Sequence, residues 1–242
     1  MTASREGLPG DGQGLLRQRL VLWLDDLLGL LFPSRCAGCG RAGPAWCAAC
    51  EARAEILAGH LCQLCGQPGH RRAECRHAFP FPVRSHARYR GPIARALLHL
   101  KYRPNRALAE VMGRWLTTIV SREGWQPTLI LPVPLAPDRL RRRGYNQAAL
   151  IAESLASHLD LPCSEAALTR IRETRSQVGL DGTARRSNVA GAFQAHAEIL
   201  GGSRVCVVDD LCTTGATLMA CGQACAQAGA LEVYGLTVGR AG

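Results

Sequence analysis

Lysine is almost absent from this chain of 242 residues: Lys101 is the only one, so the formal net charge of +10 comes from arginine. Such a charge favours polyanionic partners, although a generally basic surface explains it as well. A phosphate-binding loop of the GxxxxGK[ST] type needs a lysine after its glycines, and Lys101 has no such loop beside it. This argues against a P-loop nucleoside triphosphatase. No GxGxxG motif follows an early strand, which argues against a dinucleotide site.

Long uninterrupted apolar runs are also missing. The first residues lack the basic region and apolar core of a secretion signal. Residues 15–32 predict an amphipathic helix, but Arg17, Arg19, Asp25 and Asp26 interrupt them too often for a membrane-spanning segment. We expect this helix to pack against the chain's own core rather than on a membrane. The expected compartment is the cytoplasm, with no transmembrane segment.

Cysteine, in contrast, is abundant, and seven of the 12 cysteines fall between residues 36 and 75. Reduced thiols in a cytoplasmic protein indicate metal binding or burial rather than disulfides. Two CxxC pairs, Cys36 with Cys39 and Cys47 with Cys50, can direct four thiolates at one tetrahedral ion. They predict a closed structural zinc site.

A second zinc site is predicted less completely. Cys62 and Cys65 form a third CxxC pair, but only Cys75 follows, so the fourth ligand must come from His70 or His77. We favour His77; the alternative is an exposed histidine beside an incomplete site. Neither site is expected to be catalytic, because the first has no open coordination position and the second lacks a nearby acid to activate water.

Beyond residue 85, helix and strand patterns alternate, which predicts an α/β fold with a parallel sheet flanked by helices. The expected helices are 91–102, 106–120, 146–159 and 217–229, and the expected strands begin at residues 128, 203 and 232. Four more cysteines occupy core-like positions on these elements, and burial is their expected role: Cys206, Cys212, Cys221 and Cys225.

The stretch VCVVDDLCTTGATL, residues 205–218, runs from an apolar strand into two acids and a small turn. We expect the strand to end at Asp209 and Asp210, and a helix to begin near Ala216. Free backbone N–H groups, hydroxyls and the positive helix end suit a phosphate there. The two carboxylates can accept hydrogen bonds from sugar hydroxyls. The pattern therefore predicts a site for a phosphorylated ribose. The turn residues concerned are Thr213, Thr214, Gly215, Ala216 and Thr217.

This stretch resembles the signature of type I phosphoribosyltransferases that binds 5-phosphoribosyl 1-pyrophosphate (PRPP). The whole chain resembles the ComF family: a cysteine-rich zinc module precedes LKY, PVPL, RGYNQA and TRSQVGLDGTARRSNVAGAF, in that order. The resemblance implies a type I phosphoribosyltransferase-like parallel sheet flanked by helices, with a small N-terminal zinc-ribbon module. We therefore expect an N-terminal tail and amphipathic helix over 1–32, a zinc-ribbon module over 33–82 and a phosphoribosyltransferase-like domain over 83–242.

The resemblance also implies roles for individual residues. Asp209 and Asp210 would hold the ribose hydroxyls, residues 213–217 would wrap the 5-phosphate, and Arg143 would clamp the pyrophosphate. With Mg²⁺, these acids and Arg143 would form the catalytic set. A solvated charged face is the simpler interpretation of the neighbouring Arg139, Arg141 and Arg142.

Residues 172–193 are polar and glycine-bearing, which is typical of a mobile lid over a charged substrate. Thr174, Gln177, Arg185 and Asn188 match the family pattern there. The chain departs from that pattern at two positions. Ala184 stands where relatives usually carry an acid, and Ala78 where they often carry the last cysteine of a second zinc site.

No acceptor pocket can be recognised in the sequence, so two function classes remain. The first is a phosphoribosyltransferase; the second is a non-catalytic, PRPP-sensing module that docks single-stranded DNA or a protein. The family name implies handling of DNA, together with competence-machinery proteins, during natural transformation. Aromatic residues make up only 5% of the chain. The candidates for base stacking near the zinc module are Trp46, Phe79, Phe81 and Tyr89.

Overall fold

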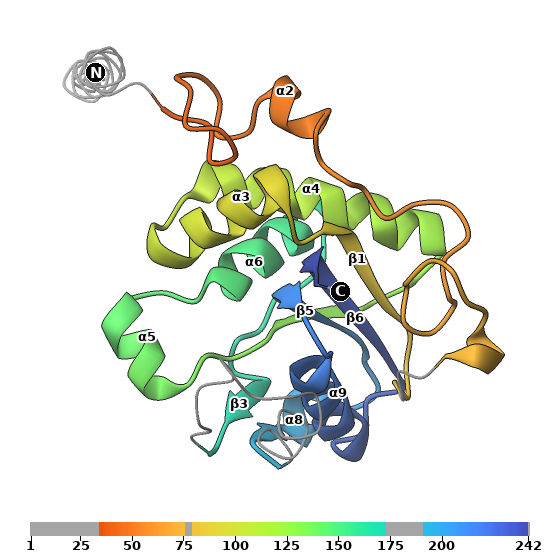
Figure 1. Cartoon of the computed structure of the whole chain (residues 1–242). Coiled ribbons are helices and arrows are strands. Elements are labelled where there is room, and N and C mark those ends of the chain that lie inside the picture. Colours follow the sequence, from red (N-terminus) through yellow and green to blue (C-terminus); the bar gives the residue numbers. More distant parts are fainter. Residues whose placement is uncertain (1–33, 76–78, 173–190, 242) are drawn as a thin grey trace, which may run out of the picture.

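The computed structural model describes residues 34–75, 79–172 and 191–241. A four-stranded sheet lies at its centre, and all of its neighbouring strands are parallel. The strands are, in spatial order, β1 (Val83–Arg88), β6 (Glu232–Arg240), β5 (Arg204–Cys212) and β2 (Leu129–Pro132). The predicted parallel α/β architecture is confirmed (Figure 1).

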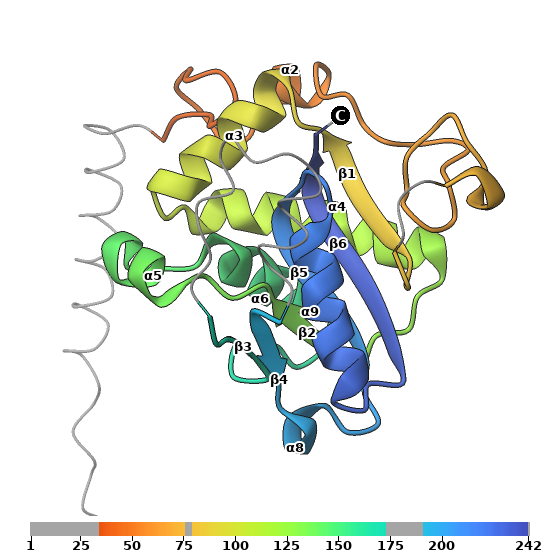
Figure 2. The same ribbon diagram turned by 60° about the horizontal axis from the view of Figure 1, so that its bottom comes forward.

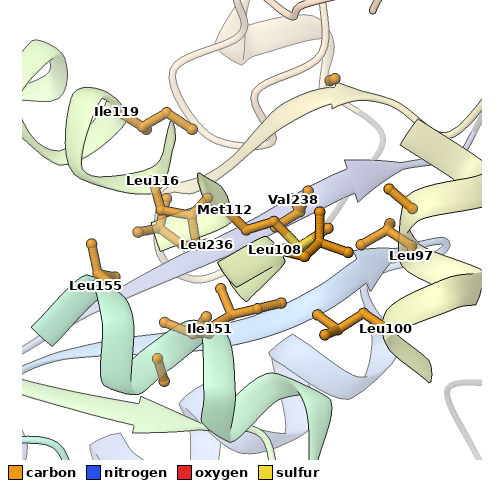
Figure 3. Close-up of a cluster of buried hydrophobic side chains, with 14 of the residues drawn as sticks. Leu97, Leu100, Leu108, Met112, Leu116, Ile119, Ile151, Leu155, Leu236 and Val238 are labelled. Carbon is orange, nitrogen blue, oxygen red and sulfur yellow. The ribbon is translucent and has the colours of Figure 1, made fainter. Parts of the chain in front are cut away.

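Helices cover both faces of this sheet (Figures 1 and 2). One face packs against α3 (Gly91–Tyr102), α4 (Arg106–Glu123) and α6 (Gln147–Leu159), and the other against α9 (Ala216–Gln227). Because successive side chains of a strand point to opposite faces, Cys206 and Val208 join the first layer, whereas Val205 and Val207 join the second. Figure 3 shows the larger cluster, in which leucines of α3, α4 and α6 meet Leu236 and Val238 of β6.

Local capping explains where two of these helices begin. The Asn105 side chain accepts a hydrogen bond from the Leu108 N–H at 2.9 Å and starts α4, which ends at Gly124 in a left-handed conformation. Asn146 accepts one from the Ala148 N–H at 3.1 Å and starts α6. Its amide also donates to the Val133 carbonyl at 3.0 Å, so α6 is tied to the loop that leaves β2.

The structure differs from the expected elements of the α/β part in one strand end and in five unpredicted elements. Strand β5 continues two residues past the acids, to Cys212, because it stays paired with β6 as far as Arg240. Strand β1 was not predicted. Where we expected only a loop after β2, a short helix α5 (Pro137–Arg143) forms, with proline at its start and arginines in its last turn. The other unpredicted elements are β3 (Leu168–Arg170), β4 (Phe193–Ala195) and α8 (Ala197–Leu200).

The cysteine-rich segment contributes only α2 (Ala48–Glu51) and the short helix η1 (Arg72–Glu74). It nevertheless shares the core of the α/β part. Trp46 packs edge-on against Trp115 of α4, with ring centroids 5.1 Å apart, and the Val83 N–H donates to the Leu64 carbonyl at 2.7 Å. A domain boundary at residue 83 therefore stays a prediction, because apolar packing crosses it.

Several expectations fall on residues outside the described ranges. These are the amphipathic helix at 15–32, the lid residues Thr174, Gln177, Arg185 and Asn188, and the departures at Ala78 and Ala184. Among the described helices, none combines the length and the apolar content needed to cross a bilayer. The expected burial of Cys206, Cys212, Cys221 and Cys225 is confirmed.

Candidate functional site

The first cysteine cluster has the geometry of a tetrahedral zinc site. Cys36 Sγ lies 3.6 Å from Cys50 Sγ, and Cys39 Sγ lies 3.8 Å from Cys47 Sγ. All four sulfurs lie within 4.8 Å of one another. A tetrahedral zinc with Zn–S bonds of about 2.3 Å separates its sulfurs by about 3.8 Å. The four thiols therefore fit a closed zinc site.

The backbone around this cluster favours thiolates. Burial on its own would raise the pKa of Cys36, but backbone hydrogen bonds with Cys47, Gly38 and Cys39 outweigh burial and lower the pKa to about 6. The turn is tight, because a Cβ at Gly38 would lie 2.7 Å from Cys50 Sγ. Zinc binds the deprotonated thiol, so the turn favours metal binding at Cys36, whereas burial and the neighbouring thiols raise the pKa of Cys50.

The second cluster contains Cys62, Cys65, Cys75 and His70, again with all ligand atoms within 4.8 Å. His70 Nε2 lies 3.3 Å from Cys65 Sγ, close to the separation of about 3.5 Å expected between sulfur and nitrogen ligands of one zinc. Our preferred fourth ligand, His77, lies outside the described residues. In the described part of the chain, His70 is the histidine that completes the group.

A cavity of about 430 Å³ opens at the carboxyl ends of β5 and β2 and gathers most of the predicted ribose-phosphate residues. The lining includes Asp209, Asp210, Arg143, Thr213, Gly215, Ala216 and Thr217. Thr214 is not part of the wall; its hydroxyl accepts a hydrogen bond from the Ala216 N–H at 3.4 Å, at the start of α9. Residues separated by many positions in the sequence thus meet in one pocket.

The two acids have unequal surroundings. Burial raises the pKa of Asp209 well above its usual value, and the neighbouring charge of Asp210 raises it further, while Arg170 acts in the opposite direction. The Asp210 N–H donates to Asp209 Oδ1 at 2.9 Å and holds that carboxyl in place. If both carboxyls are ionised, a cation or hydrogen-bond donors must stabilise their negative charges. Paired carboxylates facing one pocket fit the oxygen-ligand chemistry of Mg²⁺ bound with a phosphate substrate.

The phosphate loop touches the end of the cysteine-rich segment. Gly215 has a φ of +77°, which favours glycine, and a Cβ there would lie 2.0 Å from the ring of Phe79. Phe79 is 4% exposed and follows the second zinc cluster closely in the chain. The loop that starts α9 therefore packs against the residues that follow the second cluster.

Four cationic side chains line the pocket: Lys101, Arg139, Arg143 and Arg170. The Arg143 guanidinium donates to the side chain of Gln147, which is also in the wall. Tyr145 Oη donates to the Leu100 carbonyl at 2.6 Å and thereby ties the RGYN turn to α3. By contrast, Arg141 pairs with Asp138, and neither Arg141 nor Arg142 lines the pocket.

Sequence reasoning missed Lys101, Gln147 and Arg170 as pocket residues. The only lysine of the chain, placed in the LKY motif, was a usable signal for Lys101. Arg170 lies on β3, a strand that sequence reasoning did not predict, and no local pattern marks it.

The expectation about base stacking was wrong for three aromatic residues. Trp46, Phe79 and Phe81 are 9%, 4% and 7% exposed, because they pack inside the protein. Tyr89 lines the cavity of Asp209 and Asp210 instead of a zinc-module surface. The described aromatic residues of the zinc module are therefore not available for stacking on nucleic-acid bases.

Comparison with known proteins agrees with these features. Residues 27–79 match a family model described as a double zinc ribbon domain. The DNA utilization protein YhgH of Escherichia coli K12 is 31% identical over 198 residues, which cover 77% of this chain and 86% of that protein. Competence protein F of Haemophilus influenzae is 42% identical over 94 residues, or 38% of this chain and 41% of that protein. Competence protein ComFC of Bacillus subtilis is 27% identical, covering 71% and 74%.

A match to a double zinc ribbon, followed by a parallel α/β domain, defines a class of two-part proteins with a zinc ribbon before an α/β domain. The chain belongs to the ComF family, as the match to most of the length of YhgH shows. Its two cysteine-rich clusters are the zinc sites of the double ribbon. Among solved structures, glutamine PRPP amidotransferase of B. subtilis matches with a TM-score of 0.40 and 17% identity, over 58% of this chain and 30% of that one. That overlay is too loose to bear on function.

Proposed function

We propose that this protein binds PRPP together with Mg²⁺ in the pocket lined by the end of β5, the loop after β2 and α5. One observation carries the proposal: a single cavity of about 430 Å³ contains the acid pair, the phosphate loop and four cations. Asp209 and Asp210 accept hydrogen bonds from the ribose hydroxyls, while the loop that starts α9 receives the 5-phosphate. Arg139 and Arg143 also line the cavity and can hold the pyrophosphate.

We further propose that the bound sugar is transferred to an acceptor. The bond between ribose C1 and pyrophosphate breaks, its electron pair leaves with the pyrophosphate oxygen, and the lone pair of the acceptor forms the new bond to C1. Negative charge grows on the leaving group, and Lys101, Arg143 and Arg170 stand where they can stabilise it. Mg²⁺, held with the substrate near the two acids, would supply further positive charge to the same group.

Calorimetry of PRPP with Mg²⁺ tests the binding step. Asp209→Asn combined with Asp210→Asn should cost on the order of 3 kcal/mol, a loss of about a hundredfold in affinity, because two charged acceptors are removed. The matched control, Asp160→Asn with Glu198→Gln, makes the same change in charge on the surface and should leave affinity unchanged. Unaltered PRPP binding in the first variant would falsify the site assignment.

Transfer is tested separately by screening amines and nucleobases for release of pyrophosphate. Release that depends on both PRPP and one acceptor establishes the enzyme. Tight PRPP binding without release for any acceptor supports the alternative, a PRPP-sensing protein without catalysis.

A second candidate function is contact with single-stranded DNA by the zinc ribbon and its arginines. The observation in its favour is the kinship with proteins named for competence and DNA utilization, combined with a net charge of +10. A surface that binds phosphates releases counterions, so affinity for an oligonucleotide should fall steeply with salt. A module that docks only proteins would show no such salt dependence in its affinity for an oligonucleotide. Fluorescence anisotropy across a salt series separates the two.

A further inference from the structure

A second concave site lies beside the first zinc cluster, away from the PRPP pocket. It is a cavity of about 290 Å³ lined by Arg41, Arg53 and Arg95, together with Ala49 and the ligands Cys39 and Cys50. The three arginines come from separate segments: the loop between the two CxxC pairs, the turn after α2, and α3. All three are exposed, so the cavity is open to solvent.

Carboxylates do not neutralise these arginines. Within the described ranges, none of the three forms an ion pair. The nearest acids in the chain are engaged elsewhere: Glu51 accepts the indole N–H of Trp46, and Glu55 faces Arg88 and Arg90. Arg95 donates to the Gly38 carbonyl, which joins α3 to the zinc turn and fixes one side of the cavity.

The zinc site itself balances only part of this charge. One Zn²⁺ with four thiolates carries about −2, whereas three guanidiniums carry about +3. The remainder of about +1 matches the single negative charge of a phosphodiester. Free pyrophosphate carries more negative charge than this site can balance.

We propose that Arg41, Arg53 and Arg95 form a binding site for one backbone phosphate of single-stranded DNA. The inference rests on the proposed contact with DNA and names the surface responsible for it. It also agrees with the burial of the aromatic residues. Because Trp46 packs against Trp115, it is not available to stack on bases, and recognition here uses the phosphate. The chemical signature is the planar fork of arginine, which binds two phosphate oxygens at once.

The test uses the full-length, zinc-loaded protein and a fluorescein-labelled 15-mer of thymidine in a salt series. Arg41→Gln with Arg53→Gln should weaken binding about tenfold at 0.1 M salt and reduce the size of the log-log slope by about 0.7, the share of one neutralised phosphate. Arg106→Gln with Arg114→Gln, on the exposed face of α4, makes the same change in charge and should alter neither by as much. Arg41→Lys with Arg53→Lys should keep only part of the wild-type affinity.

Each result decides something different. Equal weakening by the two glutamine pairs would show general surface charge and overturn the proposal, as would unchanged binding in the variant at positions 41 and 53. Loss of zinc in the variant Arg41→Gln with Arg53→Gln would instead assign the arginines to the metal cluster.

If the wild type binds no oligonucleotide even at low salt, the DNA function itself fails. Pyrophosphate that competes more strongly than the oligonucleotide for this site would make a free anion the ligand. PRPP affinity, measured in parallel, should stay constant.

Discussion

The two zinc sites differ both in their ligands and in what they support. The first takes all four sulfurs from two CxxC pairs and packs through Trp46 on the helix layer of α3, α4 and α6. In the second, the described residues bring three sulfurs together with the imidazole of His70, and its cysteines belong to the cluster on the α9 side. From there Phe79 reaches Gly215 of the phosphate loop. The first site is therefore joined to the layer of α3, α4 and α6, whereas Phe79, which follows the second site, touches the loop that starts α9.

The largest expected effect comes from breaking the first site. Cys36→Ser should remove one of two zinc equivalents, and structural zinc sites contribute about 10 kcal/mol or more of binding free energy to folding. We expect a strongly reduced yield of folded protein and a much lower Tm. Elemental analysis and thermal unfolding measure both.

The matched control is Cys163→Ser, because Cys163 belongs to neither cluster. It should keep two zinc equivalents and change stability little. If Cys36→Ser also kept both metals and the wild-type Tm, the first cluster would not be a structural zinc site.

The contrast between the sites also shows what sequence reasoning can reach. Spacing of two residues within a CxxC pair is a local property, so the first site could be predicted in full. The fourth ligand of the second site depends on how a longer segment folds back, and spacing left His70 and His77 open. The meeting of the acid pair and the following turn in one cavity was likewise predictable, because strand, acids and turn are contiguous.

Long-range features were not predictable in this way. Arg170 reaches the pocket from a short strand paired with β4, more than twenty residues later in the chain, and no local pattern announces such a pairing. The burial of Phe79 has the same origin: its environment is created by Gly215, which is distant in sequence.

An effect of intermediate size should follow from breaking the second site. His70→Ala should remove one zinc equivalent, since losing a direct ligand weakens metal binding by much more than the 10- to 100-fold expected for an indirect contact. The fold should persist, but PRPP affinity should fall by about tenfold as Phe79 loosens over the phosphate loop. Metal analysis and calorimetry on one sample measure both quantities.

His77→Ala is the natural comparison for that variant. If it keeps both zinc ions while His70→Ala loses one, His70 is the ligand. The reverse result would restore His77 as the fourth ligand. A loss of zinc with unchanged PRPP affinity would show that the second ribbon and the phosphate loop are independent.

The smallest expected effect is a pH dependence of stability at the contact between the first zinc site and α4, where Trp46 packs on Trp115. His86 also stacks on Trp115, with ring centroids 4.4 Å apart, and its Nε2 is buried without a partner. Burial, assisted by the charge of Arg122, lowers the pKa of His86 from 6.5 to about 4. Above pH 6.5 neither state of the protein is protonated there. As the pH falls below 6.5, the unfolded chain gains a proton that the folded chain does not, so stability is lost.

At pH 5.5 this loss amounts to about 1.4 kcal/mol relative to pH 8. His86→Phe should keep the stacking on Trp115 and remove this part of the pH dependence. Release of zinc in acid affects both proteins alike, so the difference between their unfolding free energies at pH 8 and pH 5.5 isolates His86. Chemical denaturation at the two pH values measures it. Identical pH profiles for the two proteins would mean that His86 titrates normally and that the contact between the first ribbon and α4 leaves it open to water.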